Sequence, residues 1–465
     1  MSNSRRRKAV VAAGLLALMT TAACGGGDDG DGGGDGSSIT VWTTDTLPDR
    51  VAKTEAIIDR FTKDTGVEVK LVGVAEDQFT QTLTSAAAAG DLPDVIGSLS
   101  LASVRTLQAN ELLDTEASAA VIESLGADTF SEEALTLTSD GDTQLSVPSE
   151  IWSQLLLYRK DLFEEAGLQP PETYDQLMAA AAELDSADVA GFVGPTAAGD
   201  SFTQQTFEHI ALANGCQLVD DAGEVVLDSP ECEGAFDFYG SLVKDYSLPG
   251  AQDVDTVRAA YFSGKASMIV WSTFILDELA ALRNDALPSC PECRDDPTFL
   301  AKNTGFVTAL QGPDGEEPAQ FGEVVSWSIP TGAATEQAQQ FVEFLMSDAY
   351  VDWIAIAPEG KFPARRGTEA KPEEYVEAWA DLDVGVDKKA PLADFYPPEV
   401  IEVLQTGPEA FDRWGILQGQ GDLVGSLMGE LPVPKAVAAL ASGEVDAEGA
   451  AQAAAEDVRS IQASQ

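Results

Sequence analysis

Three short apolar segments alternate with two amphipathic ones, and this alternation restricts the possible fold more than any other feature of the chain. Residues 39–42, 67–74 and 92–96 have the apolar patterns of strands. Residues 51–65 and 77–89 have helical apolar spacing, and a glycine follows each of them. Parallel strands need such helical crossovers, so we expect an α/β fold with a parallel sheet covered by helices.

The same patterns continue along the chain, with no internal repeat. Strands are predicted at residues 155–158, 306–310 and 323–329, and residues 264–271 are predicted to form a turn followed by a buried strand. Helices are predicted at residues 99–109, 160–166, 174–184, 204–213, 337–346 and 349–357, and over most of 398–464. Two domains are expected, because the part of the chain that can pack a core is too long for one.

The first 38 residues do not have the composition of a packed domain. Arg5-Arg-Arg-Lys8, a short apolar run and small residues before Cys24 are the parts of an export signal. The apolar run is shorter than the roughly 20 residues that span a bilayer. Glycine and aspartate dominate residues 25–38, which predicts a flexible tether. We therefore assign 1–23 to a signal peptide and 24–38 to Cys24 with its tether.

The residues around the predicted cleavage point also resemble a known motif. Ala22-Ala23-Cys24 resembles the lipobox of bacterial lipoproteins, with Thr21 where leucine is usual. The resemblance implies that the Cys24 thiol is acylated and anchors the protein to the extracellular face of the cell membrane, where stable anchoring needs the full lipid modification. The alternative is an ordinary cleaved signal.

The charge balance excludes whole classes of partner. The chain has 78 acidic and 27 basic side chains; four basic ones lie in the signal, which leaves 23 against 78, or −55. Repulsion excludes nucleic acid and anionic membrane surfaces as partners. The acidity fits a salt-adapted host and an ordinary acidic secreted protein equally well.

Four cysteines remain besides Cys24, and an even number in an exported chain implies disulfides. Three connectivities are possible, of which sequence proximity favours Cys216–Cys232 and Cys290–Cys293. The Cys290-Pro-Glu-Cys293 spacing also occurs in one half of zinc sites, and in redox motifs. The sequence has no second pair or nearby histidine to complete the zinc site, and no strand-then-helix setting for the redox motif.

The sequence contains no pattern typical of an enzyme. His209 is the only histidine, and its apolar helical surroundings favour a structural role over that of a general base. The chain therefore lacks the histidines that a metal triad or a Ser-His-Asp set would need. It also has no glycine-rich phosphate loop. We predict no cofactor and no metal. Catalysis by a pair of carboxylates, as in glycosidases, stays an open alternative. With 78 acidic residues in the chain, a close pair of acids is no evidence for a catalytic role.

The tryptophans indicate a ligand site, because an indole face suits the C–H face of a sugar ring. The seven are Trp42, Trp152, Trp271, Trp327, Trp353, Trp379 and Trp414. Trp42 and Trp271 end predicted strands, where α/β sheets form their ligand crevice, and we favour them as site residues over core residues. For Trp152, Trp327 and Trp414 both interpretations stay open. Trp353 and Trp379 lie in predicted helices and are expected to pack.

Five segments in this order carry a family resemblance. They are Ile39-Thr-Val-Trp42, Ala88-Ala-Gly-Asp-Leu-Pro-Asp94, Leu156-Leu-Tyr-Arg-Lys-Asp-Leu-Phe163, Gly264-Lys-Ala-Ser-Met-Ile-Val-Trp271 and Gly360-Lys-Phe-Pro-Ala-Arg365. The chain from residue 39 to about 459 resembles the extracellular solute-binding proteins of family 1, the lipoprotein receptors of carbohydrate importers. The Cys290 loop and residues 415–422 depart from the general pattern, so the particular ligand does not follow.

The resemblance implies two α/β lobes of the type II periplasmic-binding-protein fold, which close over a ligand by hinge bending. The first lobe is expected at 39–148 plus 305–357, and the second at 149–304 plus 358–465. The implied ligand-binding residues are Trp42, Thr43, Asp45, Glu76, Ser98, Glu150, Trp152, Asp200, Trp271, Trp327 and Arg365. Asp45, Glu150 and Asp200 would accept hydrogen bonds from sugar hydroxyls. Arg365 has an equally weighted alternative, a structural pairing with acids.

We therefore expect a monomeric sugar-binding lipoprotein that passes its ligand to the permease of an ABC importer, and not an enzyme. Two alternatives stay open. One is a receptor for another solute, either a polyamine or a metal; iron receptors of this shape use adjacent tyrosines, and the chain has no Tyr-Tyr pair. The other is a secreted polysaccharide-processing enzyme, which would turn over a glycoside instead of releasing it unchanged.

Overall fold

The computed structural model describes residues 38–406 and 411–465. The predictions of a signal peptide, of acylation at Cys24 and of the tether up to residue 37 lie outside the described residues. Everything below concerns the described part of the chain.

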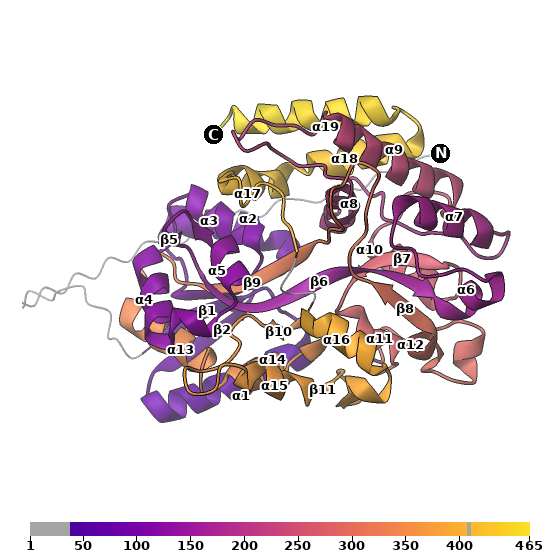
Figure 1. The fold of residues 1–465 in the computed structure, drawn as a ribbon. Coiled ribbons are helices and arrows are strands. Elements are labelled where there is room, and N and C mark those ends of the chain that lie inside the picture. The colour runs from indigo at the N-terminus through magenta and orange to yellow at the C-terminus, as the bar shows by residue number, and fades with distance from the viewer. Residues whose placement is uncertain (1–37, 407–410) are drawn as a thin grey trace, which may run out of the picture. The chain divides into compact units, whose positions relative to one another are not determined.

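A mixed sheet runs through the centre of the described fold (Figure 1). Its strands, in spatial order, are β10 (Phe362–Pro363), β6 (Val147–Arg159), β9 (Gly322–Ser328), β3 (Val95–Leu99), β1 (Ser38–Thr43) and β2 (Glu68–Gly73). β1 pairs in parallel with both β2 and β3, which confirms the parallel sheet expected from the alternating pattern. β9 then pairs antiparallel with both β3 and β6.

The 13-residue strand β6 belongs to two sheet regions. Its first half pairs with β9 and β10, and its second half lies between β7 (Met268–Ser272) and β8 (Thr304–Val307). The predicted strand at 155–158 is therefore only the end of β6. The earlier part was missed because Ser149 and Glu150 are polar although they are buried inside the strand. Two short hairpins add β4 (Ser139–Asp140) with β5 (Thr143–Gln144) and β11 (Asp383–Val384) with β12 (Ala390–Pro391).

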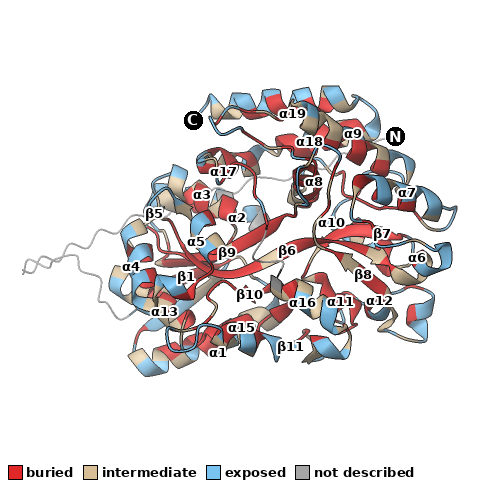
Figure 2. Cartoon of the chain, viewed as in Figure 1, coloured by how far each residue is buried: buried red, intermediate tan, exposed pale blue. Residues whose placement is uncertain are grey.

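Helices surround the strands, and their outward faces carry most of the exposed residues (Figure 2). Those around β1, β2, β3 and β10 are α1 (Pro48–Thr65), α2 (Glu76–Ala89), α3 (Leu101–Ala109), α4 (Thr115–Leu125), α5 (Glu132–Leu137), α13 (Thr335–Leu345), α14 (Tyr350–Ile354) and α15 (Glu374–Ala380). The others are α6 (Lys160–Ala166), α7 (Tyr174–Leu184), α8 (Ser201–Ala213), α9 (Pro230–Asp245), α10 (Val254–Phe262), α11 (Ile275–Leu279), α12 (Phe299–Asn303), α16 (Pro398–Thr406), α17 (Gly421–Glu430), α18 (Pro432–Ser442) and α19 (Ala447–Gln462). α17 packs against α3, and α19 packs against α9 and α18.

Local capping chemistry decides several element boundaries. α1 and α2 end at Gly66 and Gly90, as predicted, with both glycines in the left-handed conformation at φ 79° and 72°. The predicted strand at 92–96 is shifted, because β3 runs on to Leu99. α3 then begins after Ser100, whose hydroxyl accepts a hydrogen bond from the backbone N–H of Ser103. The predicted helix at 349–357 is shorter, since α14 covers only Tyr350–Ile354.

The apolar core lies on both faces of the strands. Along β6, Leu155 and Leu157 belong to one buried cluster and Leu156 belongs to another. Successive strand residues point to opposite faces, so this part of β6 is covered on both sides. The central strands are accordingly coloured as buried in Figure 2.

The four described cysteines meet in the two pairs favoured by sequence proximity. Cα atoms lie 4.6 Å apart for Cys216 and Cys232, and 4.9 Å apart for Cys290 and Cys293, both within disulfide range. Among the described residues, no single helix has the length and hydropathy of a membrane span. The bent pair α17 and α18, at 50° to each other, passes that test only when combined.

Candidate functional site

A cavity of about 520 Å³ lies above β6 and β9. One side is formed by the connection after β1, by β3 and by α3. The other is formed by α8, by the end of β7 and by the start of α10. Glu150 and Trp152 of β6 lie opposite Val325 and Glu323 of β9, and all four contribute to the base of the cavity. A concave site of this size between structural elements is where small ligands bind.

Six of the predicted site residues meet at this cavity. They are Asp45, Ser98, Glu150, Trp152, Asp200 and Trp271. The segments that carry them are far apart in the chain, so the fold assembles the site from both sheet regions. Glu76 begins α2, and its side chain lies outside the described part of the structure.

Ser98, which lines the cavity from β3, has an unusual backbone conformation. Its φ of 60° is uncommon for a residue other than glycine, and it lies where the β3–β9 register shifts between Ile96 and Leu99. Thr43 holds this region together: its hydroxyl lies 3.3 Å from the Ser98 hydroxyl and accepts from the Asp45 N–H. Thr43 is buried and does not line the cavity, so it supports Ser98 and Asp45 from behind. Strained residues of this kind and bulges concentrate at functional sites.

Besides Thr43, three further predicted cleft residues, Trp42, Trp327 and Arg365, do not line the cavity. Trp42 is packed in an apolar cluster with Val74 and Phe79, and does not line the cavity. Trp327 is buried in the core because Gly97 makes room for its ring: a Cβ at that glycine would lie 2.1 Å from the indole. Strand position alone did not distinguish these two indoles from cavity residues.

Arg365 does not line the cavity either, and its contacts differ from those expected in its structural alternative. The guanidinium is buried and donates to the Met346 and Leu125 carbonyls, at 2.5 and 2.8 Å, and to the Thr129 hydroxyl at 3.0 Å. These acceptors are neutral oxygens, and not the acids of the structural alternative. Arg365 ties together the segments that contain these three acceptors.

Glu150 lines the cavity, yet its carboxylate is occupied by the protein. Lys361 donates to Oε1 at 2.5 Å, while the Trp353 indole N–H donates to Oε2 at 2.9 Å. Ser149 also donates to Oε2. Lys361 lies over the Trp353 ring as well, 4.2 Å from its centroid. The predicted role of Glu150 as a free acceptor therefore needs qualification, because its oxygens already have three donors.

A second buried ion cluster joins four distant segments at the cavity wall. Arg413 donates from Nη1 to Glu323 at 2.7 Å and from Nε to Glu208 at 3.2 Å. Glu323 also accepts the backbone N–H of Leu101 at the start of α3, and Glu208 accepts that of Trp414. Burial raises the pKa of Glu323, and Arg413 opposes that shift. The cluster connects α8, β9 and α3 with the chain after residue 410.

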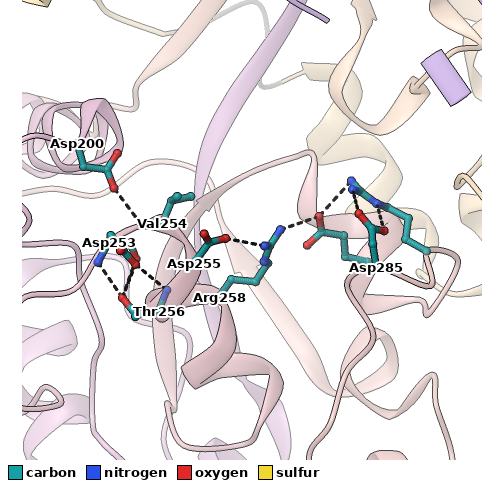
Figure 3. A network of polar contacts seen from close by, with 9 residues as sticks. Asp200, Asp253, Val254, Asp255, Thr256, Arg258 and Asp285 are labelled. Atoms are coloured by element: carbon teal, nitrogen blue, oxygen red, sulfur yellow. Dashed lines mark hydrogen bonds and ion pairs between the residues drawn. The ribbon is translucent and has the colours of Figure 1, made fainter. Parts of the chain in front are cut away.

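The remaining charged side chains of the cavity also have partners. Arg50 lies 3.6 Å from Asp45, and Arg283 pairs with Glu278 at 3.1 Å and with Asp285 at 2.7 Å. Figure 3 shows Asp285 at one end of this ion-pair chain, which continues through Arg258 to Asp255.

Asp200 is held by backbone donors, as Figure 3 also shows in part. Its Oδ1 accepts the Phe202 N–H at the start of α8, and its Oδ2 accepts the Val254 N–H at the start of α10. Each of the nine described charged residues that line the cavity thus has a partner within the protein. Trp152, which is partly exposed, and Trp271 add apolar faces among them.

Beside Arg50 and Arg283 lies a buried carboxylate that the protein leaves without a partner. Asp277 in α11 is fully buried, and neither of its oxygens has a hydrogen-bond partner. Burial, and then the neighbouring Glu359, raise the pKa of Asp277 to about 8, which Arg283 and Arg50 only partly oppose. The folded protein therefore favours the protonated form of this side chain.

Asp277→Asn is expected to stabilise the protein at pH 8 and to do so less as the pH falls to about 4. An acid whose pKa is raised on folding contributes its stability below the unfolded pKa and loses it as pH rises through the folded pKa. Asparagine imitates the protonated form at every pH. Melting temperatures of both proteins between pH 4 and pH 8 measure this, with the exposed Asp255→Asn as control. A difference that does not change with pH would contradict the assignment.

His209 has the structural role favoured from the sequence. It is fully buried in α8, its Nδ1 accepts the Phe321 N–H at 3.2 Å, and burial lowers its pKa to about 4. It is neutral at neutral pH and does not line the cavity. Within the described residues, no group of three or more His, Cys, Asp or Glu side chains is arranged to hold a metal ion.

Sequence reasoning missed several residues of the cavity. The most prominent are Arg50, Gln154, Glu208, Arg283, Glu323, Lys361 and Arg413. The period of two along β6 was an available signal for Gln154, because residues 150, 152 and 154 of one strand share a face. Arg413 had no such signal, since its partners Glu208 and Glu323 lie 205 and 90 residues away in the chain.

Comparison with known proteins gives a consistent result. A family model described as bacterial extracellular solute-binding protein matches residues 44–352. The putative ABC transporter periplasmic-binding protein YcjN of Escherichia coli K12 is 30% identical over 399 residues, which cover 83% of this chain and 86% of that protein.

Solved structures share the fold at low sequence identity. Maltose-bound MalE3 of T. maritima superposes with a TM-score of 0.69 at 18% identity, covering 91% of this chain and 99% of that one. A sugar transporter of Arthrobacter chlorophenolicus with bound laminaribiose gives 0.70 at 18% identity, with 91% and 99% covered. The described chain therefore has the two-lobed α/β architecture that these neighbours share.

Proposed function

Because this chain belongs to the bacterial extracellular solute-binding protein family, a family of binding proteins and not of enzymes, we propose that it captures a sugar or oligosaccharide in the cavity. We further propose that it delivers this ligand to the permease of an ABC importer. The name of the Escherichia coli relative supports delivery to an ABC transporter. The sugars bound by two structural neighbours support a sugar as the class of ligand.

The observation that carries the sugar proposal is the internal pairing of the cavity charges. The described carboxylates and cations that line it are already matched to one another or to backbone donors. A polyamine or an anion would have to displace these partners at a cost in free energy. Trp152 and Trp271 instead offer apolar faces beside polar groups, which suits an uncharged polyhydroxylated ring.

A thermal-shift screen tests the ligand class. We expect neutral sugars to raise the melting temperature, because a ligand at 100 times its Kd stabilises the native state by about 2.7 kcal/mol. Spermidine and ferric citrate serve as controls for the polyamine and metal alternatives. Stabilisation by either control alone would refute the sugar assignment, and turnover of a bound glycoside would refute a pure receptor.

We propose the lobe boundaries 39–148 plus 305–357 and 149–304 plus 358–465, with β6 and β9 as the connecting strands of the hinge. The pairing of β6 with β9 in its first half and with β7 and β8 in its second supports this role. The segment after residue 358 contacts both lobes in this division, since α17 packs on α3.

The membrane anchor is a separate proposal, carried by the sequence of residues 5–38. Cys24→Ser is expected to release the protein from the membrane fraction into the medium, since the thiol that would carry the lipid is removed. Fractionation and immunoblotting of producing cells measure the change, with Cys290→Ser as the cysteine control. Continued membrane association of the Cys24→Ser protein would refute acylation as the anchor.

We also propose that Cys216–Cys232 and Cys290–Cys293 form disulfides in the exported protein. A bridge across a loop of about 17 residues contributes roughly 3 kcal/mol. Peptide mapping without reduction is expected to recover both pairs. Free thiols at these four positions, or crossed pairs, would be the opposing result.

A further inference from the structure

Gln154 differs from every other side chain in β6 that faces the cavity. Glu150, Trp152 and Gln154 alternate along the strand, so their side chains share the cavity face. Gln154 lies opposite Ser272 of β7, at the point where β6 passes from one sheet region to the other. Its backbone is held by the pairing with β7 and by a hydrogen bond from its own N–H to the Phe321 carbonyl at 3.0 Å, just before β9.

The side-chain amide of Gln154 is buried and makes no hydrogen bond within the described structure. The residue is 0% exposed, and neither Oε1 nor Nε2 has a hydrogen-bond partner. Among the described residues that line the cavity, the only other buried polar atom without a partner is Nε of Arg50. An unpaired buried amide costs free energy, and natural proteins keep few of them. A functional reason for this one is therefore expected.

We propose that Gln154 is a specificity-determining residue that binds adjacent hydroxyl groups of the ligand through its carbonyl oxygen and its NH₂ group. This inference rests on the proposed sugar-binding function and assigns one contact within it. The amide offers an acceptor and a donor in one plane, and a sugar hydroxyl is itself both donor and acceptor. A ligand without the matching hydroxyl leaves the amide unpaired, which is how such a site discriminates.

A purely structural amide predicts different behaviour. Replacing an unsatisfied buried amide by an apolar side chain of the same shape is neutral or stabilising. Gln154→Met is therefore expected to keep or raise the melting temperature whichever interpretation holds. Only the binding role also predicts weaker sugar binding, by roughly tenfold to a hundredfold, the equivalent of one or two lost hydrogen bonds.

The test uses calorimetric titration of the whole protein with glucose, maltose and laminaribiose, and with monodeoxy forms of whichever sugar binds. Gln252→Met is the matched control, because Gln252 is a buried amide outside the cavity whose Nε2 donates to the Pro249 and Gly250 carbonyls. The control is expected to lose stability and to keep its sugar affinity.

For the wild type, one deoxy sugar is expected to bind at least about tenfold more weakly than its parent. Gln154→Met is expected to lose that discrimination. Equal affinity and equal discrimination in the wild type and Gln154→Met would overturn the role of Gln154 while leaving the sugar receptor intact. A wild type that binds none of the sugars would instead remove the proposed function and this inference with it. If Gln154→Met fails to fold, Gln154→Asn, which shortens the amide, is expected to show the same loss of discrimination.

Discussion

Arg413→Met is expected to lower the free energy of unfolding by about 3–5 kcal/mol, because it leaves two buried carboxylates without their cation. Glu208 and Glu323 both pair with this guanidinium, and the three side chains are almost completely buried. The guanidinium also lies over the Phe321 ring, 4.4 Å from its centroid. Urea unfolding of the variant and the wild type measures the difference.

A matched control separates this burial effect from the loss of an arginine as such. Arg459 pairs with Asp228 at 2.6 Å at a much more exposed position, so Arg459→Met should cost no more than about 1 kcal/mol. Adding Glu208→Gln to Arg413→Met should recover part of the lost stability, because one uncompensated charge is removed. Similar losses for Arg413→Met and Arg459→Met would show that the cluster is not a buried charge network.

The ion clusters also explain how far the sequence could predict the site. Periodicity and capping residues located β1, α1, β2 and α2, because these signals are local. The partners of buried charges are not local: Lys361 meets Glu150 across 211 residues, and Arg413 meets Glu208 across 205. The sequence therefore identified several acids of the cavity and none of the cations that neutralise them.

The tryptophans show the same limit of sequence-based prediction for apolar side chains. Trp271 and Trp327 both lie in or at the end of a strand with serine beside them, and only Trp271 lines the cavity. The difference arises from Gly97 on the neighbouring strand β3, which accommodates Trp327 in the core. Such complementarity between two strands becomes visible only when their register is known.

Trp271→Ala is expected to weaken binding of the proposed sugar by about thirtyfold or more and also to destabilise the protein. Loss of a buried aromatic anchor costs about 2 kcal/mol or more in affinity. The ring also packs on Phe202, with centroids 4.7 Å apart, and is 6% exposed, so its truncation should remove about 3–5 kcal/mol of stability. A single measurement cannot separate these two effects.

Trp379→Ala provides the comparison, since Trp379 is equally buried but does not line the cavity. Its indole donates to the Pro358 carbonyl at 2.8 Å and packs on Phe362, so the variant should lose stability while its folded fraction keeps its affinity. Trp271→Phe, which retains an aromatic face, should bind better than Trp271→Ala. If Trp271→Ala and Trp379→Ala lose stability alike and both keep the wild-type affinity, Trp271 is a core residue and the stacking face must be sought at Trp152, the partly exposed indole in the same cavity.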